Sequence, residues 1–232
     1  MDTVLTFEQA SYWNEHQIRP LFEHVNYSFK KGAFYTIVGA SGVGKTTFLS
    51  IAGGLDHLRS GAVRYKGLTL SQLGLTHYRK RHVSTIFQAH HLIPYMTALQ
   101  NVTTAMEIKG SHLPQKEQCA LHVLKQIGID EAQATQRVLG LSSGQKQRVA
   151  IARAICCDTD IFLADDPTAN LDDASSRDIV RLFEHLAHDL GKCILMVTHD
   201  EQIARISDVN LSLHDSGIHE MRSNHAPLKQ FI

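Results

Sequence analysis

Short apolar runs alternate with polar, helix-compatible stretches along the chain, and this order predicts an α/β fold. Residues 34–38, 161–164 and 193–197 are apolar and β-prone enough to be strands buried on both faces. Residues 83–87 form another short apolar run. A glycine or a polar residue follows each run directly, so each predicted strand ends where chemically active side chains begin.

Other β signals come from strict alternation and from turn residues. Val25, Tyr27 and Phe29 are separated by polar residues, which predicts a half-buried strand over residues 21–29, beside another strand over residues 3–8. Later strand signals lie at residues 63–70, with Gly67 in a turn, and at residues 211–214 and 218–221, which flank Asp215, Ser216 and Gly217 as a closing hairpin.

Helix signals dominate residues 97–140 and recur on both sides of the strand at 161–164. The predicted helices cover residues 46–55, 115–127, 145–157 and 173–190. Pro114 introduces the second of them, Ser142 is a good N-cap for the third, and Gly191 stops the fourth. The basic run of Arg79, Lys80, Arg81 and His82 is expected to be a solvated face.

One glycine-rich stretch has a specific phosphate-binding pattern. It reads G-x-x-x-x-G-K-T and consists of Gly39, Ala40, Ser41, Gly42, Val43, Gly44, Lys45, Thr46 and Thr47. Glycines let the backbone curl so that N–H groups point at phosphate oxygens, and the helix start adds a partial positive charge. Lys45 supplies a charge for the β- and γ-phosphates, and the Thr46 hydroxyl is placed for Mg²⁺. The flanking strand and helix favour a P-loop over a glycine turn with an incidental lysine.

Three further features suggest chemistry. The helix start at Ser142 has small residues and free N–H groups, which makes it a second anion site. Asp165 and Asp166 follow a buried strand directly, where carboxylates are costly unless they serve a cation or a proton. Tyr12 or Trp13 would stack on a purine base, or would be an ordinary core or surface aromatic.

Composition narrows the function classes. The 232 residues are 43% hydrophobic and carry a formal net charge of zero, so no broad basic surface for nucleic acid is indicated. No apolar run approaches the ~18 residues that span a bilayer, and no signal peptide is visible. The four cysteines lack metal-site spacing, which is typical of reduced thiols in a cytosolic protein.

Histidines are numerous, at 15, and metal binding is the tempting interpretation. The neighbours His90 and His91 are the strongest candidates for a metal-binding pair. Adjacent side chains usually point apart, and the sequence has no H-E-x-x-H motif, so surface and hydrogen-bonded histidines are favoured.

Taken in order, these motifs resemble those of the ATP-binding subunit of ABC transporters, over essentially the whole chain. Residues 53–56, 87–94 and 166–172 are similar to the single-domain type found with lipoprotein-releasing, macrolide-export and antimicrobial-peptide-export permeases. The resemblance implies a P-loop NTPase core with a parallel sheet, an N-terminal antiparallel β subdomain and a helical insert subdomain. It implies a single ABC domain over residues 1–232, with the core at about 1–88 and 159–232 and the helical part at about 89–158.

The resemblance also implies a role for each motif. Tyr12 (or Trp13) would stack on adenine, and residues 39–47 would be the Walker A loop. Asp165 would hold Mg²⁺ through water, together with Thr46 and Gln88. Catalysis would fall to Lys45, Gln88, Asp166 as the general base, and His199 as the switch histidine at the γ-phosphate. The signature motif, which in this family binds ATP held by the other subunit, would be Ser142, Ser143, Gly144 and Gln145, and the D-loop would be Asn170, Leu171 and Asp172.

Two residues depart from the family pattern. Ser143 stands where the signature usually has its first glycine, a change that we expect to be mild because a helix N-terminus has ordinary φ. Asp166 stands where the family usually has glutamate, and its side chain is one methylene shorter. Because a misplacement of ~1 Å can cost ~10²-fold in rate, the sequence predicts slow but nonzero hydrolysis and a longer-lived ATP-bound dimer.

The leading prediction is therefore an ATPase subunit that dimerises head to tail and energises a separately encoded membrane permease. It would be cytoplasmic and peripheral at the inner face of the membrane, and residues 88–106 are the expected docking surface. The alternative is an ATP-gated interaction module with little turnover. A soluble ABC ATPase acting on ribosomes or DNA is disfavoured, because paired domains, a long coiled coil and a basic face are not seen. Specificity in this family lies mostly in the membrane subunit, so no particular substrate is implied.

Overall fold

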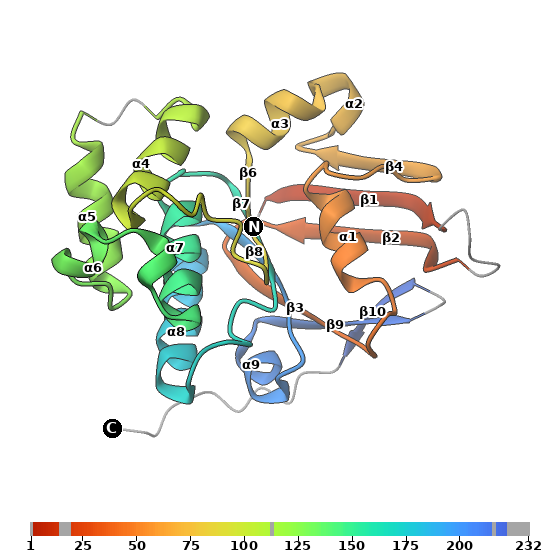
Figure 1. The fold of residues 1–232 in the computed structure, drawn as a ribbon. Coiled ribbons are helices and arrows are strands. Elements are labelled where there is room, and N and C mark those ends of the chain that lie inside the picture. Colours follow the sequence, from red (N-terminus) through yellow and green to blue (C-terminus); the bar gives the residue numbers. More distant parts are fainter. Residues whose placement is uncertain (1, 14–19, 112–113, 215–216, 222–232) are drawn as a thin grey trace.

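The computed structural model of the protein describes residues 2–13, 20–111, 114–214 and 217–221. In these residues a mixed six-stranded sheet and an antiparallel four-stranded sheet lie on one side of the molecule, and a group of helices lies on the other (Figure 1). The predicted α/β class, with a mainly parallel sheet, an antiparallel β subdomain and a group of helices, is confirmed.

The larger sheet brings the chemistry-bearing segments to one edge. Its strands, in spatial order, are β10 (Gly217–Met221), β9 (Val209–His214), β3 (Ala33–Val38), β8 (Cys193–Val197), β7 (Ile161–Asp165) and β6 (Val83–Ile86). All neighbours are parallel except β10, which is antiparallel to β9. Because carboxyl ends of parallel strands meet at one edge, the loops after β3, β8, β7 and β6 are brought together there.

The two faces of this sheet belong to two different cores, as the alternation of strand side chains requires. Tyr35, Leu163 and Leu195 pack with helix α1 (Lys45–Ala52) and the antiparallel sheet. Phe34, Phe162 and Ile194 pack instead with the helices of the other side, including α8 (Asp173–His188). Strands that read as continuous apolar runs are therefore buried on both faces, as predicted.

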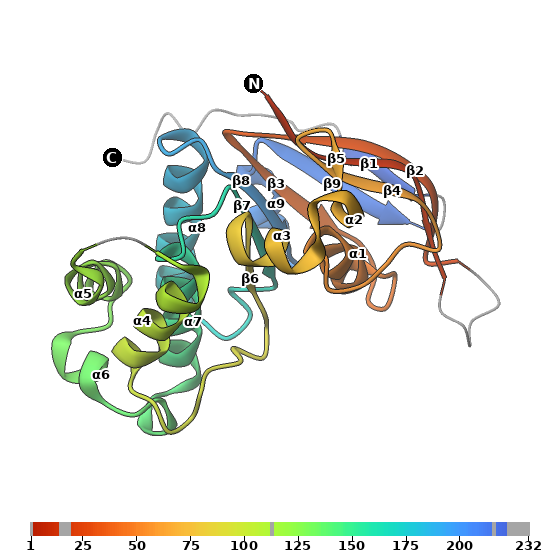
Figure 2. The same cartoon turned by 90° about the horizontal axis from the view of Figure 1, so that it is seen from above.

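The antiparallel sheet packs on the side of α1 that faces away from the six-stranded sheet. Figure 2 shows the arrangement from above. Its strands, in spatial order, are β2 (Phe22–Lys30), β1 (Thr3–Tyr12), β4 (Ser60–Tyr65) and β5 (Leu68–Thr69). The ring of Phe48 from α1 stacks on Phe7 at a centroid distance of 4.3 Å and meets Phe22 edge-on at 5.6 Å. Aromatic packing therefore fixes the helix that follows the P-loop between the two sheets.

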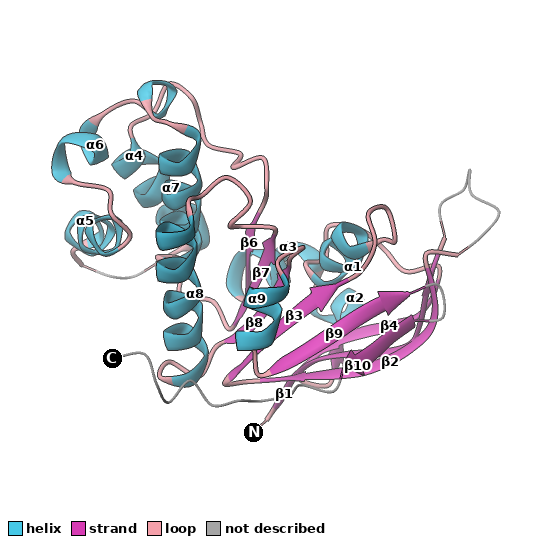
Figure 3. Cartoon of the chain, turned by 90° about the horizontal axis from the view of Figure 1, so that it is seen from below, coloured by secondary structure: helices cyan, strands magenta, loops and turns pink. Residues whose placement is uncertain are grey.

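A group of further helices lies together beyond β6, as Figure 3 shows. They are α4 (Ala98–Lys109), α5 (Lys116–Gln126), α6 (Glu131–Thr135), the 3₁₀ turn η1 (Val138–Gly140) and α7 (Ser143–Ile155). Val102, Leu124 and Val149 are buried between them. Across the part of the chain that the structure describes, no helix is long and apolar enough to cross a membrane. The proposed division of the chain into core and helical parts agrees with this grouping and stays a prediction.

Three short helices were not predicted, because four to seven residues show too little periodicity to recognise. They are α2 (Leu70–Leu73), α3 (Leu75–Arg81) and α9 (Glu201–Ile206). Several boundaries also moved. For example, α1 ends at Ala52, since Gly53 and Gly54 leave the helix, and β1 runs on through register shifts to include Tyr12. Of the predicted closing hairpin, the turn residues Asp215 and Ser216 lie outside the described residues.

The expectation of a solvated basic run at residues 79–82 is wrong for two of its four members. Buried Tyr78 anchors α3 by donating its hydroxyl hydrogen to Ala52 O at 2.8 Å. The helix is thereby drawn onto the core, so Arg79 donates to Gly54 O at 2.6 Å and the His82 ring stacks on Tyr65 at 4.4 Å. Lys80 and Arg81 are exposed.

Candidate functional site

The glycine-rich loop lies between the end of β3 and the start of α1, with Gly44 as the helix N-cap. Gly44 has a φ of 103°, and a Cβ there would approach Leu21 Cβ to 3.1 Å. Gly42 also has a positive φ, of 79°. A Cβ on Gly39 would come within 2.9 Å of Leu213 O. The glycines are therefore required by backbone conformation and close approach, which leaves the loop N–H groups and the α1 N-terminus for an anion.

Lys45 is held against this loop. Its side chain is 6% exposed, and its ammonium donates to Gly39 O at 2.7 Å and to Ala40 O at 2.8 Å. Burial lowers the pKa of Lys45, while the carboxylates of Asp165 and Asp166 act in the opposite direction. One of the three N–H groups of the ammonium is left for a phosphate oxygen.

A direct contact joins the loop to the neighbouring acidic strand end. Thr46 Oγ1 donates to Asp165 Oδ2 at 2.8 Å, although the two residues are far apart in the sequence. The strand β8 lies between β3 and β7 in the sheet, so the side chains of Thr46 and Asp165 meet across the end of β8. A hydroxyl oxygen and a carboxylate oxygen side by side are the donors that Mg²⁺ prefers, so the residues present fit this ion.

Asp166 follows in a strained backbone. Its φ is 45°, and its N–H donates to Val197 O at 3.0 Å. Burial raises the pKa of Asp166, the positive potential of His199 and Lys45 opposes this rise, and Asp165 and Asp200 add to it. A carboxylate with a raised pKa is a stronger proton acceptor, which suits a general base.

His199 and Gln88 lie in the loops beyond β8 and β6, and both are exposed. Thr198, before the histidine, is fully buried, and its Oγ1 accepts a hydrogen bond from Asp200 N at 3.0 Å. Asp200 then caps α9 through its side chain. The unpredicted helix α9 therefore sets the direction in which the chain leaves β8 at His199.

The predicted N-cap at Ser142 is confirmed. Its hydroxyl accepts from Gln145 N at 3.2 Å, and Gln145 Oε1 accepts from Ser142 N at 2.8 Å, a complete capping box. Ser143 is the first residue of α7 and does not have a positive φ, as expected. A Cβ on Gly144 would lie 3.4 Å from Asn170 O, so the predicted signature and D-loop residues are neighbours within one chain. Asp172 caps α8 by accepting from Ser175 N at 2.9 Å.

The two halves of the predicted site remain separate within the chain. Among the described residues, no hydrogen bond joins Ser142, Ser143, Gly144 or Gln145 to the loop of residues 39–47. The second anion site at the start of α7 is exposed at Ser142 and Ser143. A separate molecule could therefore reach it.

The two candidate aromatics differ in how they are held. Tyr12, at the end of β1, donates its hydroxyl hydrogen to Asp56 Oδ2 at 2.9 Å, and the guanidinium of Arg59 lies 6.0 Å from its ring centroid. Trp13 is 41% exposed. Asp56 and Arg59 belong to the segment that follows the P-loop helix, and the sequence analysis assigned neither a role in the site. Only the pairing of β1 with β4 brings them to Tyr12.

Comparison with known proteins agrees with this arrangement. A family model described as ABC transporter matches residues 22–169. An uncharacterized ABC transporter ATP-binding protein, YclH of Bacillus subtilis, is 58% identical over 91% of this chain and 93% of its own length. The lipoprotein-releasing system ATP-binding protein LolD of Francisella tularensis is 38% identical over 79% of this chain and 81% of its own.

Two further similarities bear on assembly. The macrolide export ATP-binding/permease protein MacB of Burkholderia pseudomallei is 40% identical over 79% of this chain, but this match covers only 28% of MacB. The dimeric post-hydrolysis structure of the ATP-binding cassette MJ0796, bound to ADP and Pi, superimposes with a TM-score of 0.87. It is 33% identical and covers 95% of this chain and 99% of its own.

Proposed function

Because the chain belongs to the ABC transporter family and is an ATPase that binds ATP, we propose that it energises a separately encoded membrane permease that exports or extracts a substrate. The observation that carries this proposal is the contact of Thr46 with Asp165, which joins a phosphate-binding loop to an acidic strand end. The protein would bind the inner face of the cell membrane through the permease. Its partner in the membrane is a second polypeptide.

The proposed roles divide between binding ATP and catalysing its hydrolysis. The N–H groups of residues 39–47 and the ammonium of Lys45 bind the phosphates, and the Tyr12 ring stacks on adenine. Thr46, Asp165 and Gln88 would hold Mg²⁺, which when bound neutralises charge on the phosphate oxygens. Gln88 and His199 orient the attacking water and the γ-phosphate. Asp166 accepts the proton of the water, and its raised pKa favours that transfer.

Hydrolysis is proposed to be slow, because Asp166 is shorter than the glutamate that the family usually has. Asparagine and aspartate tolerate a positive φ better than most residues, so aspartate suits the φ of 45° at this position. The same short side chain ends about one methylene short of the expected water. Aspartate therefore lowers the backbone strain at position 166 relative to most residues, while its shorter catalytic reach predicts a long-lived ATP-bound state.

A second copy of the chain is proposed to complete each site. Ser142 and Ser143 are exposed and Gly144 is half-buried at the start of α7, and among the described residues none of the three is hydrogen-bonded to the P-loop of its own chain. In the dimeric structure of MJ0796 two cassettes associate, and this chain matches that cassette over nearly its full length. Two copies arranged head to tail would place each signature motif, with the D-loop residues Asn170, Leu171 and Asp172, against the ATP of the other.

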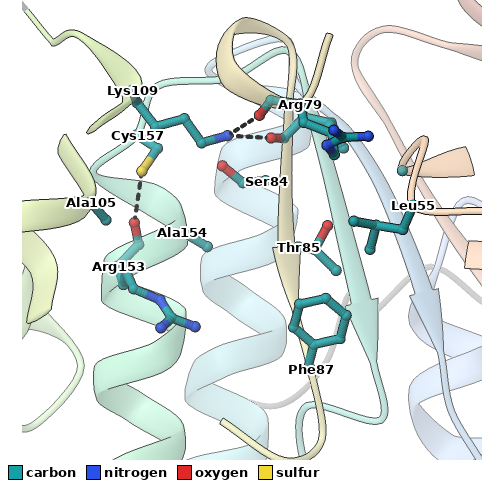
Figure 4. Close-up of a pocket in the computed structure, with 12 residues that line it drawn as sticks. Leu55, Arg79, Ser84, Thr85, Phe87, Ala105, Lys109, Arg153, Ala154 and Cys157 are labelled. Carbon is teal, nitrogen blue, oxygen red and sulfur yellow. Dashed lines mark hydrogen bonds between the residues drawn. The ribbon is translucent and has the colours of Figure 1, made fainter. Parts of the chain in front are cut away.

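The docking surface for the permease is proposed to include a pocket between β6 and the helices α4 and α7. Figure 4 shows this pocket, of about 220 Å³, with Leu55, Phe87 and Ala105 among its apolar walls. Leu55 is 49% exposed, and Tyr95, which belongs to residues 88–106, is 68% exposed. Leu92, in contrast, packs against the core, so the apolar members of residues 88–106 divide between docking and packing.

The charge of this pocket favours a permease segment with an acidic side chain. Arg79, Lys109 and Arg153 line it, and none of its lining residues is acidic. All three cations donate to backbone carbonyls; Lys109 Nζ, for instance, lies 2.6 Å from Arg79 O. Burial lowers the pKa of Lys109 and of Arg153. Among the described residues, none of these three cations forms a salt bridge with a carboxylate. A carboxylate that entered the pocket would therefore neutralise their charge.

A second candidate function is an ATP-gated interaction module, in which the bound state rather than turnover transmits the signal. Asp166 is the observation that favours it, because a general base with a shorter reach slows hydrolysis and lengthens the life of that state. The two functions differ in whether a turnover-dead variant still supports the cellular role.

The test is steady-state turnover of Mg²⁺-ATP by the purified protein, beside Lys45→Ala and Asp166→Glu, with Lys80→Ala as a matched control on an exposed lysine. We expect Lys45→Ala to abolish turnover, Asp166→Glu to raise it about tenfold or more, and Lys80→Ala to leave it unchanged.

Equal turnover of Asp166→Glu and the unchanged protein would contradict the proposed slow hydrolysis. If no form turns over while ATP is still bound, the gated module becomes the better proposal.

A further inference from the structure

The turn that follows Gln88 has an unusual backbone. His91 N donates to Ala89 O at 2.6 Å, and His90, between them, has a φ of 59°. This is a γ-turn with positive φ, which is rare and strained. His91 also has a positive φ, of 47°. Such a backbone persists only where the surrounding structure holds it.

Helix α7 provides that hold. Arg153 Nη2 donates to His90 O at 2.8 Å, and Arg153 Nη1 donates to His91 O at 2.5 Å. The His90 ring reaches the same helix twice: its Nδ1 is hydrogen-bonded to Gln147 Oε1, and its Nε2 lies 3.4 Å from Ser143 Oγ. The contacts from Ser143 to Arg153 extend along ~15 Å of the helix.

The polarity of the ring contacts follows from the acceptor at Gln147. A carbonyl oxygen only accepts, so the contact with Gln147 Oε1 is a hydrogen bond when Nδ1 is the protonated nitrogen of the His90 ring. In neutral imidazole Nε2 is then the acceptor, and the Ser143 hydroxyl donates to it. A glycine at position 143 has no hydroxyl to donate. The departure of Ser143 from the usual signature therefore adds a hydrogen bond that a family member with glycine lacks.

His91 differs from its neighbour in this respect. Its ring packs edge-on against Phe87, with centroids 4.8 Å apart, and makes none of the ring contacts with α7. The two rings have different partners, and of the two it is the His90 ring that connects the Gln88 loop with Ser143 in the described part of the chain.

We propose that His90 is a positioning residue that couples Gln88 to the start of α7 through Ser143. The inference rests on the proposed head-to-tail dimer, in which Gln88 faces the ATP of its own subunit and Ser143 faces that of the other. The link holds Ser143 in one orientation before the second subunit arrives. Without it, that ordering has to occur when the dimer closes, which weakens ATP-driven association.

The test measures turnover against ATP concentration for His90→Asn, Ser143→Gly, their double variant and His91→Asn. Asparagine tolerates positive φ, so both histidine substitutions preserve the backbone, and only His90→Asn removes the link. One neutral hydrogen bond corresponds to about three- to tenfold. We expect His90→Asn and Ser143→Gly each to raise the apparent KM for ATP by that factor, more than they lower kcat. The double variant should be no worse than either single variant, and His91→Asn should match the unchanged protein.

The proposal would be overturned if the increases in KM of the two single variants multiplied in the double variant, or if His91→Asn raised KM as much as His90→Asn. A loss of thermal stability with no change in KM would assign His90 a structural role only, and would overturn it too. Sedimentation of Asp166→Asn at saturating Mg²⁺-ATP separates the two proposals. If that variant stays monomeric, the proposed dimer is wrong and the role of His90 falls with it. If Asp166→Asn dimerises while the effects of His90→Asn and Ser143→Gly on KM multiply, only the role of His90 is wrong.

Discussion

The two ends of strand β7 differ although an aspartate flanks each of them. Asp160 precedes Ile161–Asp165 at the amino edge of the sheet, and Asp166 follows it at the carboxyl edge. Burial alone would raise the pKa of Asp160, but hydrogen bonds from Lys66, Tyr65 and Lys31 hold it well below its usual range. Burial raises the pKa of Asp166, and the opposing cations do not compensate.

The difference shows how one residue type serves stability or chemistry according to its donors. Asp160 accepts from Lys66 Nζ at 2.7 Å, from Lys31 Nζ at 3.2 Å and from the Tyr65 hydroxyl. These donors come from the antiparallel sheet and the turn before β3, so the carboxylate joins that sheet to the base of the parallel sheet. Within the described residues Asp166 has no such set of donors, and it keeps a basic oxygen at the edge where the P-loop lies.

The largest expected effect separates the two aspartates by activity. Asp166→Asn removes the proposed proton acceptor with little change in shape, so ATP turnover should fall about a hundredfold. Asp160→Asn, at a temperature where both variants are folded, should leave turnover within about twofold. Steady-state assays on the two variants in parallel measure this contrast. Similar losses in both would refute the assignment of chemistry to one edge.

The second-largest expected effect is a difference in stability between Asp160→Asn and Asp166→Asn. Asp160→Asn leaves two lysines and a tyrosine facing an amide, and this should lower the free energy of unfolding by about 2 kcal/mol, since the site is only partly exposed. Asp166→Asn removes a carboxylate that burial disfavours, so it should be neutral or slightly stabilising. Denaturant unfolding of each variant checks both signs. A stability loss confined to Asp166→Asn would reverse the comparison.

The pH dependence sharpens the same point. Because the folded pKa of Asp160 is depressed, its contribution is fully present above the unfolded value of about 4 and is lost as pH falls through the lower folded value. The stability difference between the unchanged protein and Asp160→Asn should therefore be constant at neutral pH and shrink below about pH 4. Unfolding curves at a series of pH values measure it. A difference that grows on acidification would contradict the depressed pKa.

The smallest expected effect concerns the individual donors. The side chains of Lys31 and Lys66 are 35% and 47% exposed, so water screens each pair. Lys31→Ala and Lys66→Ala should each cost about 0.5 kcal/mol, with Lys80→Ala near zero as the exposed control. Thermal unfolding of the three variants gives the ranking. If either single substitution cost as much as Asp160→Asn, the carboxylate would depend on one donor and not on three.

Local patterns allowed much of the fold to be predicted from the sequence. The strand before the P-loop, the strand before Asp165 and the helix capped by Ser142 were all predicted, because each depends on residues a few positions apart. The capping box of Ser142 and Gln145 spans three residues, within reach of any local analysis. The short helices α2, α3 and α9 were missed, since their residues pack according to distant partners.

The sequence by itself determined that the chain has a phosphate-binding loop, two acids after a buried strand and a capped helix with an exposed start. Each of those features depends on the backbone conformation of a few consecutive residues, and the types of those residues are enough to predict it. The tertiary structure decided which distant groups meet: Thr46 with Asp165, Arg79 with Gly54, and His90 with Ser143. These pairs depend on strand order and helix placement. Residues that are distant in the sequence therefore set the pKa values and the backbone strain at the site, which local sequence patterns do not reveal.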